Sequence, residues 1–260
     1  MNSNYTEIDE VIAFIHRNLD ESLSLTRLAK HVSYSPFHFT RIFKERIGLT
    51  PHYYISSLRL QRAKDLLLKT DLSIRDIGLE IGQQSLGTFT TRFTERVGVT
   101  PSAFRNSLLQ VPNHLSSLKK LNDWEGMNLS KQFPSMVTGT IETPRVFKGI
   151  ILIGLFEKPI PEGLPLYGTL LSSAGDFYFS DVRPGTYYLL ATAVSFEMHA
   201  TDILLPHRTL RAKSNTPITV APYEDIPHQK IKLREPRLDD PPILISLPLL
   251  MRNFLNRTKT

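Results

Sequence analysis

The chain has 260 residues, a formal net charge of +6 and no cysteine. Without cysteine, the sequence excludes disulfides, thiolate catalysis, zinc–thiolate sites and iron–sulfur clusters. The length suffices for two domains with ordinary cores, and the basic balance favours polyanionic partners. Lys and Arg outnumber Asp and Glu by 14 to 11 in residues 1–108 and by 17 to 14 in residues 109–260. The global charge therefore does not locate a binding site.

No apolar run in the chain reaches the ~20 residues that span a bilayer. The N-terminus also lacks the charged segment and apolar core of an export signal. We therefore expect a cytoplasmic protein without a membrane partner.

The first predicted element is an amphipathic helix over residues 5–19. Apolar residues at helical spacing, from Ile8 to Leu19, form its inner stripe. We expect this stripe to pack on the next helices and to complete their core.

Residues 24–51 are repeated, more loosely, as residues 73–101. Each copy begins with a Ser that can cap a short helix, passes through a turn into a second helix, and ends in Gly-apolar-Thr-Pro. The Thr caps and the Pro starts a further helix. The repeat predicts two helix-turn-helix units, joined by a helix that runs from Pro51 to about Lys69.

The second helix of the first copy separates cleanly into two faces. An apolar stripe of Phe39, Ile42, Phe43 and Ile47 turns inward, and the other face is polar and basic. Arg can donate two hydrogen bonds to a guanine edge, and Lys can bind phosphate. A Phe ring or a Thr methyl group can contact the thymine methyl. A single basic amphipathic helix is usually an ordinary surface helix, but the repetition favours DNA binding.

Together these residues resemble the DNA-binding domain of the AraC/XylS transcription regulators over residues 24–105. The resemblance implies double-stranded DNA as the partner and two reading helices, at about 35–47 and 85–97, in successive major-groove segments. The matching positions are Ala29, Ser35, Phe39, Arg41, Phe43, Gly48, Thr50, Pro51, Arg59, Ala63, Leu66, Leu67, Ile74, Ile77, Gly82, Ser85, Phe89, Phe93, Gly98, Thr100, Pro101 and Arg105.

The second unit departs from the family pattern. Gln83 stands where the family usually has Phe, Gly78 where it often has Ala, and Thr91 where a basic residue is common. Arg92 is one residue away, on the side that Ile42 turns inward in the first copy. We therefore expect base readout chiefly from residues 35–47.

The candidate DNA-binding residues lie on the second helix of each unit or at its cap. Arg41 is the expected principal base reader, and Leu86, Gly87 and Thr91 are expected to supply shape and methyl contacts. The full set is Ser35, Phe37, His38, Thr40, Arg41, Lys44, Ser85, Leu86, Gly87, Thr91 and Arg92. Further positive charge follows the first unit at Arg59, Arg62 and Lys64.

The character of the chain changes after residue 108, where fifteen of the 18 prolines lie. Residues 109–136 read as a linker with one short helix at 114–121. Short segments rich in β-branched and aromatic residues then predict an antiparallel β-sandwich over residues 137–260. Expected strands are 147–156, 175–183, 185–194, 216–221, 228–234 and 243–247, followed by a terminal helix at 249–257.

Residues 175–189 resemble a hairpin of transthyretin-like or carboxypeptidase-regulatory-like domains. Two alternating strands are expected to meet at Pro184-Gly185. The resemblance implies a fold and no activity.

Catalytic chemistry in the second half is expected to be absent, with no cofactor and no metal. The groups considered are Asp176, Asp181, His199, Asp202, Asp239 and Asp240; the last two are expected in a solvated turn. Apolar loops at 156–168 and 196–210 either line a pocket or a partner surface, or pack across the sandwich edge. The sequence does not separate these two alternatives.

The predicted protein is therefore multidomain: an all-α double helix-turn-helix domain at 1–108, a linker at 109–136 and an all-β antiparallel sandwich at 137–260. The expected function is sequence-specific transcription regulation, with RNA polymerase and a small-molecule effector of the C-terminal domain as further candidate partners. One alternative is a ligand- or partner-binding sandwich protein with a partly degenerate DNA-binding domain. The third is an enzyme, which would need a metal near His199 or a pair of carboxylates in the sandwich.

Overall fold

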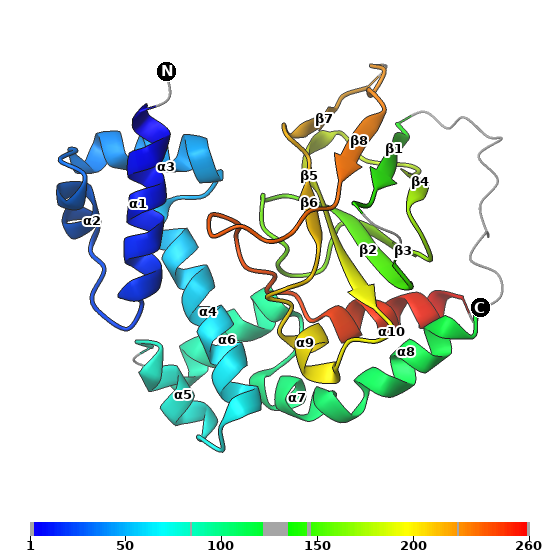
Figure 1. Cartoon of the computed structure of the whole chain (residues 1–260), viewed down its shortest axis with the longest axis horizontal. Coiled ribbons are helices and arrows are strands. Elements are labelled where there is room, and N and C mark those ends of the chain that lie inside the picture. The colour runs from blue at the N-terminus through cyan, green and yellow to red at the C-terminus, as the bar shows by residue number, and fades with distance from the viewer. Residues whose placement is uncertain (1–2, 84, 122–134, 145–146, 223, 259–260) are drawn as a thin grey trace.

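The computed structural model describes residues 3–83, 85–121, 135–144, 147–222 and 224–258, with the side chains of residues 3–5 left out. Helices build the N-terminal part and strands the C-terminal part (Figure 1). The helices are α1 (Ser3–Arg17), α2 (Leu25–His31), α3 (Pro36–Ile47), α4 (Pro51–Lys69), α5 (Ile74–Glu80), α6 (Leu86–Val97), α7 (Pro101–Asn106), a 3₁₀ turn (Ser107–Leu109), α8 (Val111–Lys119), α9 (Ala200–Leu204) and α10 (Leu247–Arg257). The strands are β1 (Val137–Glu142), β2 (Gly149–Phe156), β3 (Tyr167–Leu171), β4 (Gly175–Phe179), β5 (Gly185–Ser195), β6 (Arg211–Lys213), β7 (Ile218–Val220) and β8 (Gln229–Lys232).

Side-chain caps fix the starts of the helices in both units. Each cap oxygen accepts a hydrogen bond from the backbone N–H three residues on, which satisfies one donor of the first turn. These caps are Ser24, Ser35 and Thr50 in the first unit and Ser73, Ser85 and Thr100 in the second. The repeat predicted from the sequence is thus confirmed down to its caps.

Both reading helices also end in the same way. Gly48 after α3 and Gly98 after α6 have φ values of 85° and 87°, in the left-handed region that glycine enters without a Cβ clash. Each glycine donates its N–H to the carbonyl four residues back, in the last turn. Thr50 or Thr100 then starts the next helix, so the chain direction after the two units is equivalent.

Aromatic pairs form equivalent cores in the two units. The ring centroids of Phe39 and Phe43 lie 5.6 Å apart, and those of Phe89 and Phe93 lie 5.7 Å apart. Edge-to-face contacts continue from Phe43 to Tyr54 in α4 and from Phe93 to Phe104 in α7. The second unit therefore retains a complete core despite its looser sequence.

The strands form two sheets, with orders β4-β1-β8 and β3-β2-β5-β6, and β7 pairs with β5. The pairs are antiparallel except β1 with β8, which is parallel. Ile141 of β1, Ile153 of β2 and Leu189 of β5 belong to one buried cluster, so the two sheets share a core. The prediction of antiparallel strands is confirmed for the described pairs other than this parallel one.

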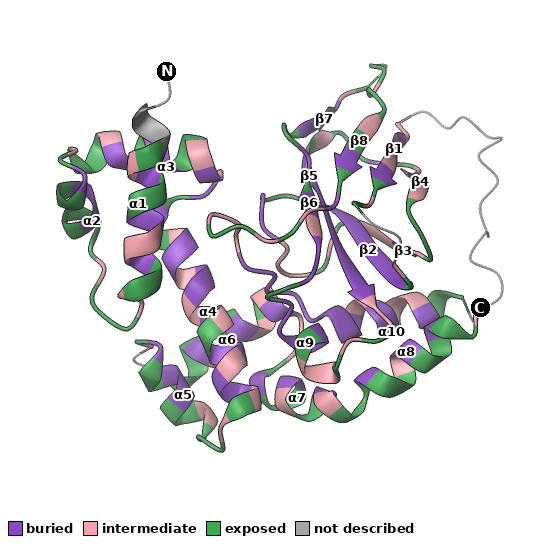
Figure 2. Cartoon of the chain, in the orientation of Figure 1, coloured by how far each residue is buried: buried purple, intermediate pink, exposed green. Residues whose placement is uncertain are grey.

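Helices cover the second face of the larger sheet. Every residue of β2 is buried, which explains its continuous apolar run. Ile151 and Ile153 face the core between the sheets, while Ile150 and Leu152 join the cluster shared with the helices. Figure 2 shows β2 buried along its length, with α9 and α10 beside it. The C-terminal region thus has one sheet enclosed on both sides.

The predicted hairpin at Pro184-Gly185 is wrong. Strands β4 and β5 occur at about the predicted places, but β4 pairs with β1 and β5 pairs with β2, in different sheets. The connection therefore crosses from one sheet to the other. β5 is buried on both faces in its second half, which suits pairing with β2 inside the larger sheet.

The predicted edge strand at 243–247 is also wrong. Residues 243–246 are buried but irregular, because their backbone groups find partners outside any sheet ladder, and Leu247 begins α10. The N–H groups of Leu244 and Ile245 donate to the Pro161 carbonyl, at 2.9 and 3.0 Å, and that of Ser246 donates to the Val97 carbonyl at 2.9 Å. The segment lies between the helical part and the sheets.

The predicted linker contains α8, which packs against α10. Val111, Leu115 and Leu118 bury its inner face. The rest of the predicted linker, including Trp124, lies mostly outside the described residues. The domain boundaries at residues 108 and 137 stay predictions.

Candidate nucleic-acid interface

The outer face of α3 carries the candidate readers of the first unit. Phe37 is 83% exposed, Arg41 and Lys44 are exposed, and Thr40 and His38 are half-buried. Proline at the first helical position and the Ser35 side chain, which accepts from the His38 N–H, fix where this face begins. The structure thus brings all six candidates of the first unit onto one helix and its cap.

The Arg41 guanidinium is held by weak contacts along the helix. One terminal nitrogen donates to a Glu45 carboxylate oxygen at 3.1 Å, and the other lies 3.4 Å from His38 Nδ1. Both partners are on the same exposed surface, where such a pair contributes little to stability. A stronger acceptor could therefore replace Glu45 at little cost.

Thr40 presents its methyl group rather than a free hydroxyl donor. Its Oγ1 donates to the Pro36 carbonyl at 2.8 Å, one turn back. The residue therefore suits an apolar contact with a base methyl group. His38 also stacks edge-on against Tyr34, with centroids 4.7 Å apart.

The outer face of α6 is open but poorer in hydrogen-bonding groups. Ser85, Leu86, Gly87 and Thr91 are exposed, and Ser85 accepts from the Thr88 N–H at 3.4 Å. These residues offer hydroxyl, methyl and backbone surface on one helix end. The structure brings the candidates of the second unit together, as it does those of the first.

The inward placement expected of Arg92 is wrong. Arg92 is exposed, and its guanidinium donates to the Gln83 side-chain oxygen at 3.2 Å. The equivalent Ile42 is buried because α1 packs against α3, whereas α6 packs against α5 and α7 and leaves position 92 open. The departure at position 83 therefore supplies a partner for Arg92.

Arg59 and Arg105, which the sequence assigns to local positive charge or to the family pattern, bind backbone carbonyls within the protein. Arg59 donates to the carbonyls of Leu19 and Glu21, at 3.3 and 2.8 Å. Arg105 donates to the carbonyls of Leu67 and Leu72, at 3.0 and 2.6 Å. Arg59 thus satisfies carbonyls in the segment that follows α1, and Arg105 satisfies carbonyls in the last turn of α4 and in the segment after it.

Lys64, also counted in the local charge, lies in the interior. It is fully enclosed, and its Nζ donates to the carbonyls of Ile243 and Leu244 at 3.0 and 3.1 Å. Its ammonium also lies 5.3 Å from the centroid of the Phe104 ring. Burial lowers the pKa of Lys64 to about 7, against the opposing charge of Asp65.

Contacts between the reading helices and the C-terminal region were missed by sequence reasoning. In α6, Arg96 donates from Nε to Glu162 at 2.6 Å and from both terminal nitrogens to Ser56 and Ser57. In α3, Arg46 lies 2.9 Å from Asp239. The positions are equivalent in the two copies, and this equivalence is the one signal that could have directed attention to them.

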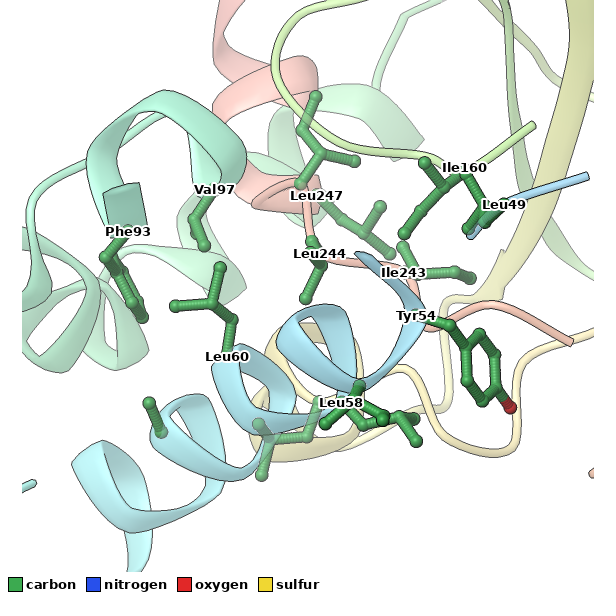
Figure 3. Close-up of a cluster of buried hydrophobic side chains, with 14 of the residues drawn as sticks. Leu49, Tyr54, Leu58, Leu60, Phe93, Val97, Ile160, Ile243, Leu244 and Leu247 are labelled. Carbon is green, nitrogen blue, oxygen red and sulfur yellow. The ribbon is translucent and has the colours of Figure 1, made fainter. Parts of the chain in front are cut away.

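The apolar cluster extends across the same boundary. Figure 3 shows Leu60, Val97 and Leu244 converging in one cluster, with Leu49 beside Ile160. In the apolar loops at 156–168 and 196–210, Ile160, Ile203 and Leu204 are buried in the packed interior. Leu164 and Leu166 remain exposed. The helical units and the C-terminal region therefore share one core.

The acidic groups considered for chemistry serve mainly as structural partners. Asp240 binds the Arg234 guanidinium through both oxygens, at 2.6 and 2.8 Å. Burial raises the pKa of Asp240, but Arg234 and the Arg237 N–H outweigh it and lower the pKa overall. The expected turn at Asp239 and Asp240 is present, but the expectation that it is solvated is wrong, because both residues are half-buried and bind arginines.

The other groups considered for chemistry, Asp176, Asp181, His199 and Asp202, do not form a cluster in the described residues. Asp176 accepts from Thr140 Oγ1 at 2.7 Å, Asp181 has a φ of 53°, and the Asp202 N–H donates to the His199 carbonyl at the start of α9. Within the described residues, no group of three or more His, Asp or Glu side chains is arranged to hold a metal ion. No helix in that part of the chain has the length and apolar character needed to cross a bilayer.

Comparisons with known proteins agree with this geometry in the helical part. Residues 28–107 match the family described as a helix-turn-helix domain. The HTH-type transcriptional activator AarP of Providencia stuartii is 34% identical over 100 residues, which cover 38% of this chain and 74% of AarP. The uncharacterized HTH-type transcriptional regulator YobQ of Bacillus subtilis is 36% identical over 97 residues, 37% of this chain and 40% of YobQ. The chain thus matches less than half the length of YobQ.

Among solved structures, similarity is found to a transcriptional regulator from Chromobacterium violaceum whose description names AraC-type DNA-binding domain-containing proteins. It is 31% identical and covers 41% of this chain and 96% of that chain, with a TM-score of 0.39.

Proposed function

Since the chain belongs to the AraC/XylS family of transcription regulators, we propose that it regulates transcription by binding a specific double-stranded DNA sequence through α3 and α6. The outer face of α3 supports this most directly, because Phe37, Arg41 and Lys44 stand exposed on one capped helix. A helix of this kind fits the major groove, where its first turns meet the base edges.

Within α3, Arg41 is the proposed principal base reader. Its guanidinium exchanges the Glu45 carboxylate for the N7 and O6 acceptors of a guanine. Phe37 and the Thr40 methyl contact thymine methyl groups, and Lys44 meets a phosphate. Ser35 and His38 hold the helix start against the DNA backbone.

The role of α6 is narrower in this proposal. Leu86, Gly87 and Thr91 follow groove shape and methyl groups, and Ser85 meets the backbone. Arg92 is exposed and can leave Gln83 for a phosphate or base. The second unit therefore adds affinity and position more than sequence readout.

The C-terminal region is proposed to be a β-sandwich-type module that senses an effector or contacts RNA polymerase. Its two sheets share one core, and the larger sheet is joined through helices to both reading units. We expect no catalytic activity, and a location in the cytoplasm, where DNA is accessible.

Selection of duplexes from a random library by the full chain tests the DNA-binding proposal. Two conserved segments with centres about 10 base pairs apart would support reading by both units. A single conserved segment would limit base readout to α3. Binding without any enriched sequence would contradict the proposal.

Arg41→Ala sharpens the assignment of the base reader. It should weaken binding to the selected duplex by about 1–3 kcal/mol and relax preference at one base position. Titration of the selected duplex and of single-base variants measures both effects. Arg208→Ala, which removes an exposed arginine from the C-terminal region, is the control with the same change of charge. Equal weakening on all sequences would contradict the role of Arg41.

A further inference from the structure

A cleft of about 480 Å³ opens between the C-terminal end of α3 and the C-terminal region. Arg46 and Ile47 of α3 form one wall. The other walls come from β6, from β8 and from residues 234–241. The cleft is of the size that small-molecule ligands occupy in proteins.

Cationic side chains dominate the lining of this cleft. Two lining residues, Asp239 and Asp240, are acidic, and both already bind arginines of the same cleft. The six cationic lining residues are Arg46, Lys213, Lys230, Lys232, Arg234 and Arg237. The lining carboxylates therefore leave an excess of four positive charges.

Four of these cations have no carboxylate partner in the part of the chain that the structure describes: the side chains of Lys213, Lys230, Lys232 and Arg237. Desolvation lowers the pKa of Lys213, although Asp240 and Asp239 act in the opposite direction. An ammonium that is partly desolvated and unpaired gains from an anion beside it.

The cleft also touches the first reading helix directly. Lys213 Nζ lies 3.9 Å from the point where a Cβ on Gly48 would stand, at the end of α3. Arg46, in the last turn of α3, binds both Asp239 and Asp9 of α1, at 2.9 and 3.4 Å. A negative group in the cleft would therefore compete with Asp239 for Arg46.

We propose that this cleft binds a small anion with two or more carboxylate or phosphate groups, and that the bound anion couples the C-terminal region to the first reading helix. The coupling rests on the proposed function, but the site does not. The anion satisfies the unpaired cations and weakens the Arg46–Asp239 contact. By reciprocity, DNA and the anion then change each other's affinity by the same factor.

A small ligand fits this cleft better than the DNA backbone does. The proposed base readers Phe37, Thr40 and Arg41 precede the last turn of α3, whereas the cleft begins in that turn at Arg46, and the lining does not include Lys44. The cleft is concave and reaches between two parts of the molecule, and the Arg46 side chain keeps only 30% of its surface exposed.

Calorimetric titration of the full chain with citrate and, separately, with inorganic pyrophosphate tests the site at about 150 mM salt. These probes distinguish carboxylate from phosphate ligands. At least one should bind saturably, with one anion per chain. Lys230→Gln combined with Lys232→Gln should weaken that binding about tenfold, because charge-assisted contacts are lost. Lys119→Gln combined with Lys120→Gln removes the same charge at the end of α8 and should leave the affinity unchanged.

Two results would overturn the site. One is the absence of saturable binding by either probe, and the other is an equal loss in the cleft and control variants, which would indicate general charge attraction. DNA titration with and without the bound probe then tests the coupling. The affinity of the selected duplex should shift about fivefold or more in the wild type, and the shift should disappear in the cleft variant.

The DNA measurement also separates failures of the two proposals. If the wild type binds the anion saturably but selects no DNA sequence, the site stands and the proposed function fails. If the cleft variant binds DNA weakly even without anion, while the α8 control binds normally, the cleft is part of the DNA surface and the anion proposal is wrong.

Discussion

Arg46 in α3 and Arg96 in α6 occupy equivalent positions, and each binds an acidic residue of the C-terminal region. The Arg96 and Glu162 side chains are 12% and 9% exposed and lie 2.6 Å apart. Arg46 and Asp239 are 30% and 19% exposed and lie 2.9 Å apart. The same arginine in the two copies is therefore buried to different depths.

The surroundings of the two arginines widen this difference. Arg96 lies 4.5 Å from the centroid of the Tyr53 ring, and the Tyr53 hydroxyl donates to Glu162. Lys158 donates to the same hydroxyl at 2.8 Å. Arg46 instead faces an open cationic cleft. The C-terminal region thus fixes the second unit through a buried network, and holds the unit with the stronger candidate readers more loosely.

Removal of Glu162 should have the largest effect on this comparison. Glu162→Ala leaves Arg96 without its carboxylate in a largely buried site, so the free energy of unfolding should fall by about 3 kcal/mol. Urea unfolding of the full chain measures the loss. Glu95→Ala, on the exposed side of the same helix end, should cost less than about 0.5 kcal/mol. Similar losses in the two variants would contradict a special role for the Arg96 network.

Lys64 joins α4 to the segment at Ile243 and Leu244, and its titration should make the free energy of unfolding depend on pH. The pKa of Lys64 is about 7 in the folded chain and near 10.5 when unfolded. Between pH 7 and 9 the unfolded state therefore binds more protons, and the stability should rise with pH by up to about 1.4 kcal/mol per unit. Well below pH 7 both states carry the proton, and this contribution is constant.

Comparison of the wild type with Lys64→Met isolates this slope, because other groups titrate in both proteins. The variant should lose most of the rise between pH 7 and 9 in urea unfolding. Lys69→Met removes an exposed lysine of the same helix and should keep the rise. An unchanged slope in Lys64→Met would show that Lys64 keeps its ordinary pKa.

The smallest effect is expected at the looser contact. Asp239→Asn should lower the free energy of unfolding by about 0.5–1 kcal/mol at low salt, because the pair is partly exposed. The loss should shrink at about 1 M NaCl, where exposed charges are screened. A loss as large as that of Glu162→Ala would remove the proposed difference between the two attachments.

The helical half was predictable because its signals are local. Caps such as Ser35 and Thr100, the glycines that end both reading helices and the apolar stripes act within a few residues. The outward face of α3 followed from the same periodicity. Arg92 was misplaced because its exposure depends on which helix packs beside α6, and no local pattern records that.

The C-terminal half was less predictable because its pairings are long-range. Alternation correctly indicated strands near β4 and β5, but it did not say that they enter different sheets. Segment 243–247 looked like a strand because it is apolar and buried, yet its backbone bonds go to Pro161, Val97 and Lys64. The cationic cleft gathers Arg46 with residues from 213 to 240, a grouping visible only in the folded chain.

The carbonyls that accept hydrogen bonds from the Lys64 ammonium lie far along the chain, so they are synthesised long after Lys64. Ile243 follows Lys64 by 179 residues. At about 5–20 residues per second, α4 leaves the ribosome roughly 9–36 s before its covering segment exists. During that interval the apolar surface later closed by Ile243 and Leu244 is open, and the Lys64 amine is free to remain hydrated and charged. Nascent chains at this stage should be the most dependent on chaperones.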